Sequence, residues 1–316
     1  MTLHTTSSNA DWKELATLPR ALGGHTLATL NEQIFVLGGT YFDELEKSLS
    51  DEIFGYDSKN DRWDSVSNTN ERPIPAYSIA ATSNSDTCIL LGGLIKKAAT
   101  ESAVHINKSG RVMQQSWGLP DSLIYASGSR FGDLAIVSGG SKSADDLSQI
   151  TNETFSLSLI DGSYRQLAPN PLNARCLCAT TANQKSLFLF AGAAYEADSV
   201  INKPESAAYD VSSDTWRKLT DYPIPVRGAA AVTLNENSLY IAGGYDSSKG
   251  DFTNEAYVYH VTENSYQRAR NIPYSAMVSL GKTEGYIYCV GGEDKAKHRS
   301  DATFRINIAS ILSSLS

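Results

Sequence analysis

The chain has 316 residues and 41% of them are hydrophobic, so it is long enough to bury a core and is not expected to be disordered. Its 27 Lys and Arg against 35 Asp and Glu give a formal net charge of −8, which argues against nucleic acid or an anionic membrane as a partner. No run of 18 apolar residues and no signal-peptide pattern are present, so we expect no membrane span and a cytoplasmic location.

The predicted elements begin with a short strand over residues 11–15. Six apolar runs follow along the chain, each ending in a pair of small residues, and this pattern is typical of buried strands. The runs end at Gly39, Gly93, Gly140, Gly192, Gly244 and Gly292. Their spacing of 47 to 54 residues is typical of one propeller blade of four antiparallel strands. The sequence therefore predicts six blades.

A second repeated register supports the same blades. Tyr56 and Tyr209 lie at equivalent positions downstream of the small pairs, and Trp63 and Trp216 follow seven residues later. With Gly-Gly, Tyr and Trp recurring in this order, the sequence resembles the kelch-repeat family over nearly the whole chain. The resemblance implies an all-β, six-bladed kelch β-propeller, formed as one domain by residues 1–316.

The two ends of the chain complement each other. The last repeat ends near Ile308 without an aromatic outer strand, whereas residues 11–15 have no inner strands before them. Trp12 lies 51 residues before Trp63, in the register of an outer strand. We therefore predict that residues 11–15 pair with the last blade and close the ring, which removes an exposed sheet edge.

The cysteines and histidines show no spacing typical of a metal or redox site. Cys88, Cys176, Cys178 and Cys289 lie in apolar runs without a C-x-x-C pair, so we expect buried thiols. The sequence has no H-x-x-x-H pair, no phosphate-binding loop and no dinucleotide-binding motif. We therefore expect neither a metal nor a nucleotide cofactor.

Alternating strands place two kinds of segment on one face, here called the mouth face. These are the links between blades and the segments between the second and third strands of each blade. Four arginines fall in the links or directly after them: Arg20, Arg72, Arg175 and Arg227. A ring of arginines around a central opening would concentrate an anion there. The alternative is that these arginines bridge neighbouring blades by pairing with carboxylates.

The last mouth-face segment differs from the others. It contains Glu293, Lys295 and Arg299, and no other blade has an arginine at the position of Arg299. Residues 293–302 resemble the motif E-x-K-x-x-x-R-[ST]-D-A of the sialic acid (N-acetylneuraminate) mutarotases, which are bacterial kelch propellers. The blades follow in circularly permuted order relative to the familiar member. Only residues 245–254 stand where that enzyme has a long, largely helical insertion.

This resemblance implies that Glu293 and Arg299 are the catalytic pair of an isomerase that interconverts the anomers of an anionic monosaccharide such as N-acetylneuraminic acid. A carboxylate would move the protons and a cation would hold the substrate carboxylate, without metal or nucleotide. Lys295 and the four link arginines would be further substrate-binding groups.

Two other functions remain open at this point. A kelch propeller without catalysis is a candidate protein-interaction module, which would expose an apolar or aromatic patch on the mouth face. Trp117, which the repeat places in a link between blades, would belong either to such a patch or to a packing plug beneath the link. Binding of an anionic sugar without turnover would need the arginines but not Glu293.

Overall fold

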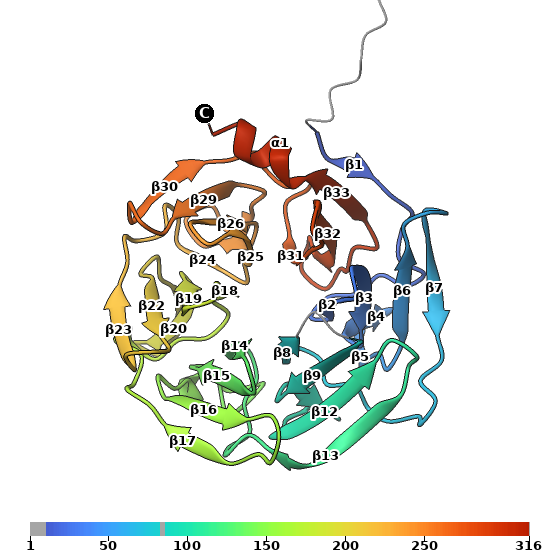
Figure 1. Cartoon of the computed structure of the whole chain (residues 1–316), viewed down its shortest axis with the longest axis horizontal. Coiled ribbons are helices and arrows are strands. Elements are labelled where there is room, and N and C mark those ends of the chain that lie inside the picture. The colour runs from blue at the N-terminus through green and yellow to red at the C-terminus, as the bar shows by residue number, and fades with distance from the viewer. Residues whose placement is uncertain (1–10, 83–85, 316) are drawn as a thin grey trace, which may run out of the picture.

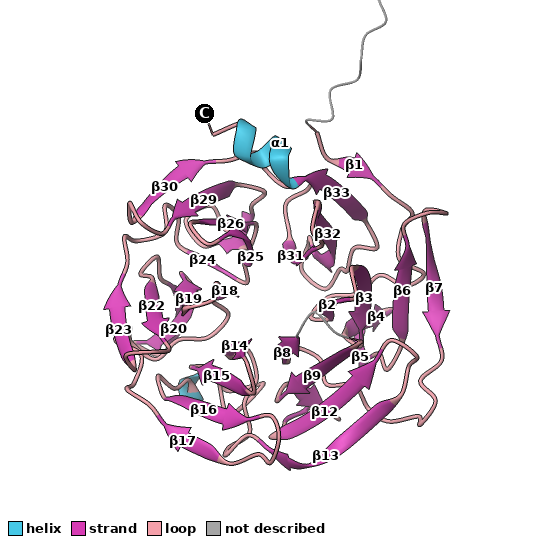
Figure 2. Ribbon diagram, viewed as in Figure 1, coloured by secondary structure: helices cyan, strands magenta, loops and turns pink. Residues whose placement is uncertain are grey.

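The computed structural model describes residues 11–82 and 86–315. Six four-stranded antiparallel sheets are arranged as blades around a central axis (Figure 1). In each blade the strands are called a to d, from the innermost to the outermost. The all-β propeller predicted from the repeat is confirmed, and Figure 2 shows how little of the described chain is helical.

The blades are numbered in chain order, and their strands are given from a to d. Blade 1 consists of β2 (Thr26–Leu30), β3 (Gln33–Leu37), β6 (Ile53–Asp57) and β7 (Arg62–Val66). Blade 2 consists of β8 (Ile79–Thr82), β9 (Thr87–Leu91), β12 (Ser102–Asn107) and β13 (Val112–Gly118). Blade 3 consists of β14 (Ser127–Phe131), β15 (Leu134–Ser138), β16 (Thr154–Ser158) and β17 (Tyr164–Gln166).

The second half of the chain repeats this order. Blade 4 consists of β18 (Ala179–Ala182), β19 (Ser186–Phe190), β22 (Ala207–Asp210) and β23 (Thr215–Lys218). Blade 5 consists of β25 (Ala230–Asn235), β26 (Ser238–Ala242), β29 (Ala256–His260) and β30 (Ser265–Arg268). Blade 6 consists of β31 (Met277–Lys282), β32 (Tyr286–Glu293), β33 (Thr303–Asn307) and the N-terminal β1 (Lys13–Glu14).

Blade 6 joins the two ends of the chain, as Figure 1 shows where β1 lies beside β33. Lys13 pairs with Arg305 and Glu14 with Phe304 in an antiparallel register. The Trp12 indole Nε1 donates a hydrogen bond to the Asn271 carbonyl at 2.9 Å, in the link that follows blade 5. The N-terminal segment therefore supplies the outer strand that the last repeat lacks.

The mouth face carries small hairpins that the sequence did not predict as strands. In blades 1, 2 and 4 the segments between strands b and c form the hairpins β4 (Thr40–Asp43) with β5 (Glu46–Leu49), β10 (Leu94–Ile95) with β11 (Ala98–Ala99), and β20 (Ala193–Glu196) with β21 (Ser199–Asn202). Blade 3 has the short 3-10 helix η1 (Leu147–Gln149) instead. In blade 5, β27 (Tyr245–Asp246) pairs with β28 (Asp251–Phe252) and with the link strand β24 (Val226–Arg227).

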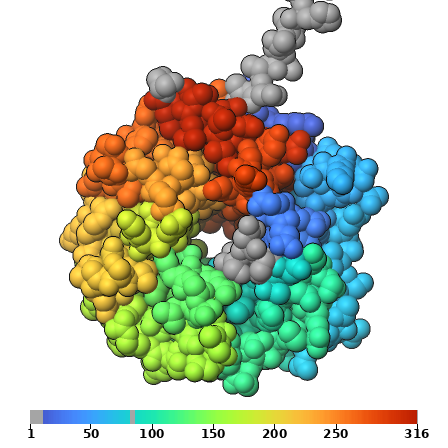
Figure 3. Space-filling model, in the orientation of Figure 1, coloured from blue at the N-terminus to red at the C-terminus, as the bar shows by residue number. Residues whose placement is uncertain are grey.

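Hydrophobic clusters fill the spaces between neighbouring blades. Phe35 and Leu37 of blade 1 share one cluster with Leu90 of blade 2. Tyr288 of blade 6 and Val36 of blade 1 share another, so the seam where the ring closes has a core like the other seams. Burial of apolar surface therefore joins each blade to the next and stabilises the ring at its seams. The centre of the ring is hollow (Figure 3).

Aromatic side chains of the outer strands also tie blades 1, 4 and 6 to the preceding link. The Trp63 indole donates to the Ala16 carbonyl at 3.1 Å, and the Trp216 indole donates to the Ala168 carbonyl at 2.9 Å. The Trp12 indole makes the equivalent bond to its own neighbouring link. Trp12 therefore occupies the outer-strand register that its spacing from Trp63 predicts.

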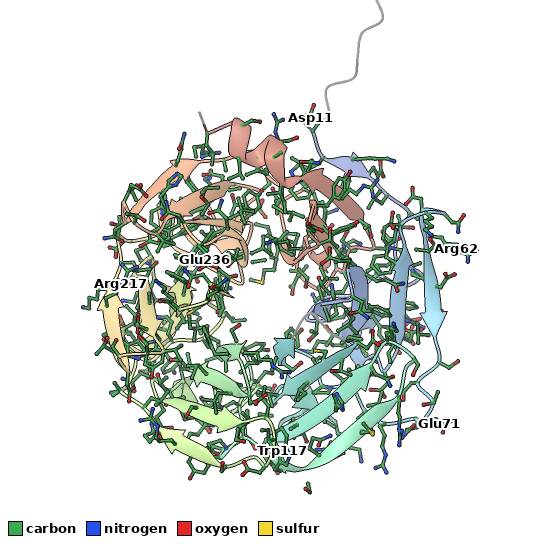
Figure 4. The ribbon with its side chains drawn as sticks, in the orientation of Figure 1. Asp11, Arg62, Glu71, Trp117, Arg217 and Glu236 are labelled. Carbon is green, nitrogen blue, oxygen red and sulfur yellow. The ribbon has the colours of Figure 1, made fainter. Side chains whose placement is uncertain are left out.

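The placement of Trp117 corrects a prediction. The residue lies within β13, because this outer strand continues to Gly118, and not in the link between blades. A Cβ atom on Gly162, in the c–d turn of blade 3, would lie 2.2 Å from Cβ of Trp117, so the indole covers that turn at the seam of blades 2 and 3 (Figure 4). Trp117 also packs against the cluster between these blades, as a packing plug would.

The C-terminal helix α1 (Ile308–Ser313) was not predicted from the sequence. Asn307 caps it by accepting a hydrogen bond from the Ala309 backbone N–H, and Ile308 and Ile311 are buried in the cluster between blades 5 and 6. The helix follows strand c of blade 6, where the other blades turn into strand d. No helix within the described residues is long and apolar enough to cross a membrane.

His25 is a buried titratable group at the start of blade 1. Its side chain lies in the protein interior, and burial lowers the pKa of the imidazole to about 4, against a smaller opposing effect of the Leu22 backbone. The unfolded chain binds a proton below about pH 6.5, but the folded chain does so only near pH 4. We therefore expect the free energy of unfolding to fall by about 3 kcal/mol as the pH decreases through this window.

Urea unfolding measured between about pH 7.5 and about pH 4 tests this expectation. The variant His25→Gln cannot titrate and should lose that part of the pH dependence, whatever its stability at neutral pH. An unchanged pH dependence in the variant would show that other groups are responsible.

Candidate functional site

The two residues predicted to act together are in direct contact. Glu293 ends β32, Arg299 precedes β33, and Nη1 of Arg299 donates to Oε2 of Glu293 at 2.6 Å. The Arg299 side chain is 4% exposed and that of Glu293 is 32% exposed. A molecule that reaches this pair from the mouth face therefore meets the carboxylate first, with the guanidinium beneath it.

Neighbouring blades hold the guanidinium of Arg299 in place. Its Nη2 donates to the hydroxyl of Tyr77 at 3.3 Å and its Nε donates to Oγ1 of Thr40 at 3.3 Å. The hydroxyls of Tyr77 and Thr40 lie 3.1 Å apart, and Thr40 donates onward to the Gly23 carbonyl at 3.0 Å. Blades 1, 2 and 6 thus meet at one charged group.

Two adjacent glycines make room for this meeting. A Cβ atom on Gly23 would lie 2.5 Å from Cδ of Arg299, and one on Gly24 would lie 2.1 Å from the ring of Tyr77. Gly24 also has a φ of 61°, which favours glycine. The link into blade 1 therefore has no side chains where the arginine of blade 6 and the tyrosine of blade 2 converge.

Aromatic rings surround the same point. The Phe42 ring centroid lies 5.0 Å from Cζ of Arg299, and Tyr77 contacts Tyr125 edge to face at a centroid distance of 5.1 Å. Neither Tyr125 nor Phe42 was predicted as a site residue. One signal was present in the sequence, because Tyr77 and Tyr125 stand at the repeat position where blades 1 and 5 have Gly24 and Gly228.

Two of the link arginines are paired with the acid of their own blade. Nε of Arg20 lies 2.5 Å from Oε2 of Glu52, in an exposed pair. Arg175 is 2% exposed, and its Nη1 and Nη2 both lie 3.4 Å from Oε2 of Glu205. Glu52 and Glu205 occupy the same position of the repeat. These two arginines therefore bind the acid of the blade that each link enters.

The other predicted binding residues are placed differently. Arg227 stacks on the Tyr245 ring at 4.3 Å and donates to Oδ1 of Asn202 at 2.9 Å. Arg72 and Lys295 are exposed. These three side chains differ from one another in exposure and in their contacts. The structure brings Glu293 and Arg299 together and distributes the remaining five predicted residues over separate contacts.

A cavity of about 400 Å³ occupies the centre of the ring. Its walls are the inner strands, and they present small and hydroxyl side chains such as Ser78, Ser129, Thr180 and Ser279. Ser78 directly follows Tyr77, so the tyrosine stands at the rim of the cavity on the mouth face. The volume is in the range typical of small-molecule sites.

The described residues contain no group of three or more His, Cys, Asp and Glu side chains that could hold a metal ion. The four cysteines are free, and burial raises the pKa of Cys88, Cys176 and Cys289 to about 12 and that of Cys178 to about 11. Protonated thiols are poor nucleophiles and metal ligands. What the site offers chemically is a half-exposed carboxylate, an oriented guanidinium and phenolic hydroxyls.

Comparisons with known proteins agree with this architecture. Residues 2–248 match the Attractin/LZTR1 beta-propeller model and residues 227–273 match the Kelch motif. "Kelch-like protein terF" of Aspergillus terreus is 28% identical over 74% of this chain and 52% of its own length. "Kelch-like protein 36" of Rattus norvegicus is 22% identical over 86% of this chain and 44% of its own length.

"Beta-scruin" of Limulus polyphemus is 29% identical over 46% of this chain and 16% of its own length. The chain therefore spans about half, or less, of the length of these relatives. The propeller model covers well over half of the chain, and the six sheets have the expected repeat. The chain belongs to the kelch-repeat β-propellers and, within them, to the Attractin/LZTR1 propeller family.

Proposed function

We propose that the protein is a kelch interaction module that binds a protein partner through its mouth face. The observation that carries this proposal is a set of large, solvent-exposed apolar side chains on the mouth-face hairpins. Tyr195, Val200 and Ile201 of the β20–β21 hairpin are 37–40% exposed, and Leu45 of the β4–β5 turn is 76% exposed. The kelch-like relatives support the same class of function.

The β20–β21 hairpin has the features of a docking element. Tyr195 and Val200 are directly opposed in its ladder and so point to the same side, while Ile201 pairs with Ala194 and points to the other. Exposed aromatic and aliphatic side chains on one projecting element are typical of the residues that contribute most to binding energy. We therefore place the centre of the interface on this hairpin.

A triple variant with Tyr195→Ser, Val200→Ser and Ile201→Ser tests the location of the interface. Partners captured by photo-crosslinking to the wild-type protein in cells, and quantified by mass spectrometry, should fall at least about tenfold in the variant. The matched control carries Leu134→Ser, Ile160→Ser and Tyr164→Ser, three exposed apolar residues of blade 3 outside the mouth-face segments. Equal recovery with both triple variants would contradict a mouth-face interface.

A second candidate function, isomerisation of an acidic sugar, is favoured by the contact between Glu293 and Arg299. The half-exposed carboxylate of Glu293 is placed to exchange protons with a ligand, and the guanidinium of Arg299 is placed to stabilise the negative charge. Proton NMR of freshly dissolved N-acetylneuraminic acid, with and without the protein, measures whether the exchange of anomers is accelerated. An exchange rate equal to that in buffer would remove this candidate.

A further inference from the structure

The rim of the central cavity is built from one repeated position with an uncommon backbone. The residue two positions before the first residue of the inner strand has a φ between 54° and 66° in blades 1 to 5. These residues are Gly24, Tyr77, Tyr125, Leu177 and Gly228. Each is followed by a residue that lines the cavity. In these five blades, the backbone at this position therefore determines how the chain approaches the cavity from the mouth face.

Glycine is the residue expected at such a position, and two blades have it. A bulky side chain with this backbone is uncommon and energetically costly, and such residues cluster at functional sites. Tyr77 and Tyr125 bear this cost in adjacent blades, and their rings contact each other edge to face. Their placement points to a role beyond folding.

The two tyrosines use their hydroxyls differently. The Tyr77 hydroxyl accepts from Arg299 and lies 3.1 Å from Oγ1 of Thr40, so it is committed to holding the guanidinium. The Tyr125 hydroxyl has no hydrogen-bond partner among the residues described here. Burial raises the pKa of Tyr125, so its phenol is neutral and can donate to a ligand.

The guanidinium of Arg299 has few N–H groups left to bind a ligand. A guanidinium has five N–H groups, and within the described part of the chain Arg299 directs them to Thr40, Glu293, Tyr77 and the His298 carbonyl. At most one N–H is left for a ligand. A ligand that reaches this pair therefore needs a further polar contact at the rim, and the Tyr125 hydroxyl, next to Tyr77, can supply it.

We propose that Tyr125 is a specificity-determining residue that hydrogen-bonds the hydroxylated body of a sugar acid bound at the mouth, while Tyr77 is a positioning residue that holds Arg299. This inference rests on the second candidate function. The Tyr125 ring contacts the Tyr77 ring, and the Tyr77 hydroxyl binds Arg299, which pairs with Glu293. Ser78 and Ala126, which follow the two tyrosines in the chain, line the central cavity, whose volume of about 400 Å³ is large enough for a monosaccharide.

The test uses the variants Tyr125→Phe and Tyr77→Phe, which keep the rings and remove the hydroxyls. The probe is N-acetylneuraminic acid, with its Kd measured by calorimetry and its anomer exchange measured by NMR at saturating concentration. We expect Tyr125→Phe to raise Kd by about 3- to 10-fold, the effect of one lost hydrogen bond. We expect Tyr77→Phe to act mainly on the exchange rate at saturation and to lower it at least about tenfold, because Arg299 loses its orientation.

Tyr164→Phe is the control, because Tyr164 is an exposed tyrosine on the outer strand of blade 3 and should change neither quantity. A wild-type Kd for Tyr125→Phe, or equal effects of the two variants on Kd and on rate, would overturn the proposal while the sugar-acid function stands. Wild-type protein that neither binds nor exchanges the sugar would overturn both together. Binding without exchange, with a raised Kd for Tyr125→Phe, would remove the isomerase and still support Tyr125 as a ligand contact.

Discussion

Removal of residues 1–16 is expected to lower the free energy of unfolding by about 3–6 kcal/mol, the cost of exposing one buried and one partly buried large side chain. Leu15 is 5% exposed in the cluster between blades 6 and 1, and Trp12 packs against the cluster between blades 5 and 6. The same segment supplies strand d of blade 6 through Lys13 and Glu14. Its removal therefore opens two seams and an edge of the ring.

Hydrogen bonds add to this expected loss. The Leu15 N–H donates to the Thr303 carbonyl at 2.9 Å, and the Ala16 N–H donates to Oδ1 of Asp61 at 3.0 Å. The Ala16 carbonyl accepts from the Trp63 indole, so blade 1 also loses its anchor. Without the segment, the buried Thr303 carbonyl and the Trp63 indole N–H lose these partners, and strand c of blade 6 becomes an exposed edge.

The single variant Trp12→Ala isolates the aromatic anchor from the strand. We expect it to cost about 1.5–3 kcal/mol in denaturant unfolding. Tyr164→Ala is the matched control, because Tyr164 occupies the same outer-strand position in blade 3 but is 57% exposed, and it should cost much less. If the truncated protein, Trp12→Ala and the control all unfold at the wild-type midpoint, the N-terminal segment does not stabilise the ring.

The repeat predicted the fold well because each blade must bury the same positions. Apolar runs such as residues 34–37 became strand b, and the small pair that follows, Gly38 and Gly39, adopts positive φ where the chain leaves the strand. Tyr56 pairs with Trp63 across strands c and d, as their shared register implies. A period of about 50 residues specifies these contacts without knowledge of any distant partner.

Elements outside the repeat were predicted less well. The hairpins on the mouth face are held by pairings within single blades that leave no common pattern, and α1 replaces a strand after Asn307. Trp117 was assigned to a link because β13 is longer than the other outer strands. Strand length depends on packing between blades, which a local pattern does not determine.

The candidate site was predicted in its centre but not at its edges. Glu293 and Arg299 come from one segment, and their spacing allows contact. Tyr77, by contrast, reaches Arg299 across 222 residues of chain, and this contact depends on ring closure and on Gly24 leaving space. Contacts of this range follow from the assembled ring and not from any single blade.

The largest catalytic effect is expected for Glu293→Gln, if the sugar-acid function holds. A positioned acid or base contributes about 10²–10⁴-fold to a rate, so the exchange of N-acetylneuraminic acid anomers should slow by that factor. The amide is isosteric and its oxygen still accepts from Arg299, so binding and folding should largely persist. NMR exchange rates, with binding measured by calorimetry, separate these two effects.

The structure supplies a closely matched control in Glu205→Gln. Glu205 also pairs with a buried arginine, Arg175, and it is 45% exposed against 32% for Glu293. The two pairs thus have similar chemistry, but only that of Glu293 and Arg299 lies beside Tyr77 at the rim. If both variants slow exchange equally, the effect is a loss of structure and not of proton transfer. If Glu293→Gln alone slows exchange, the carboxylate at the rim carries the chemistry, and the hairpin interface is then a separate function of the same face.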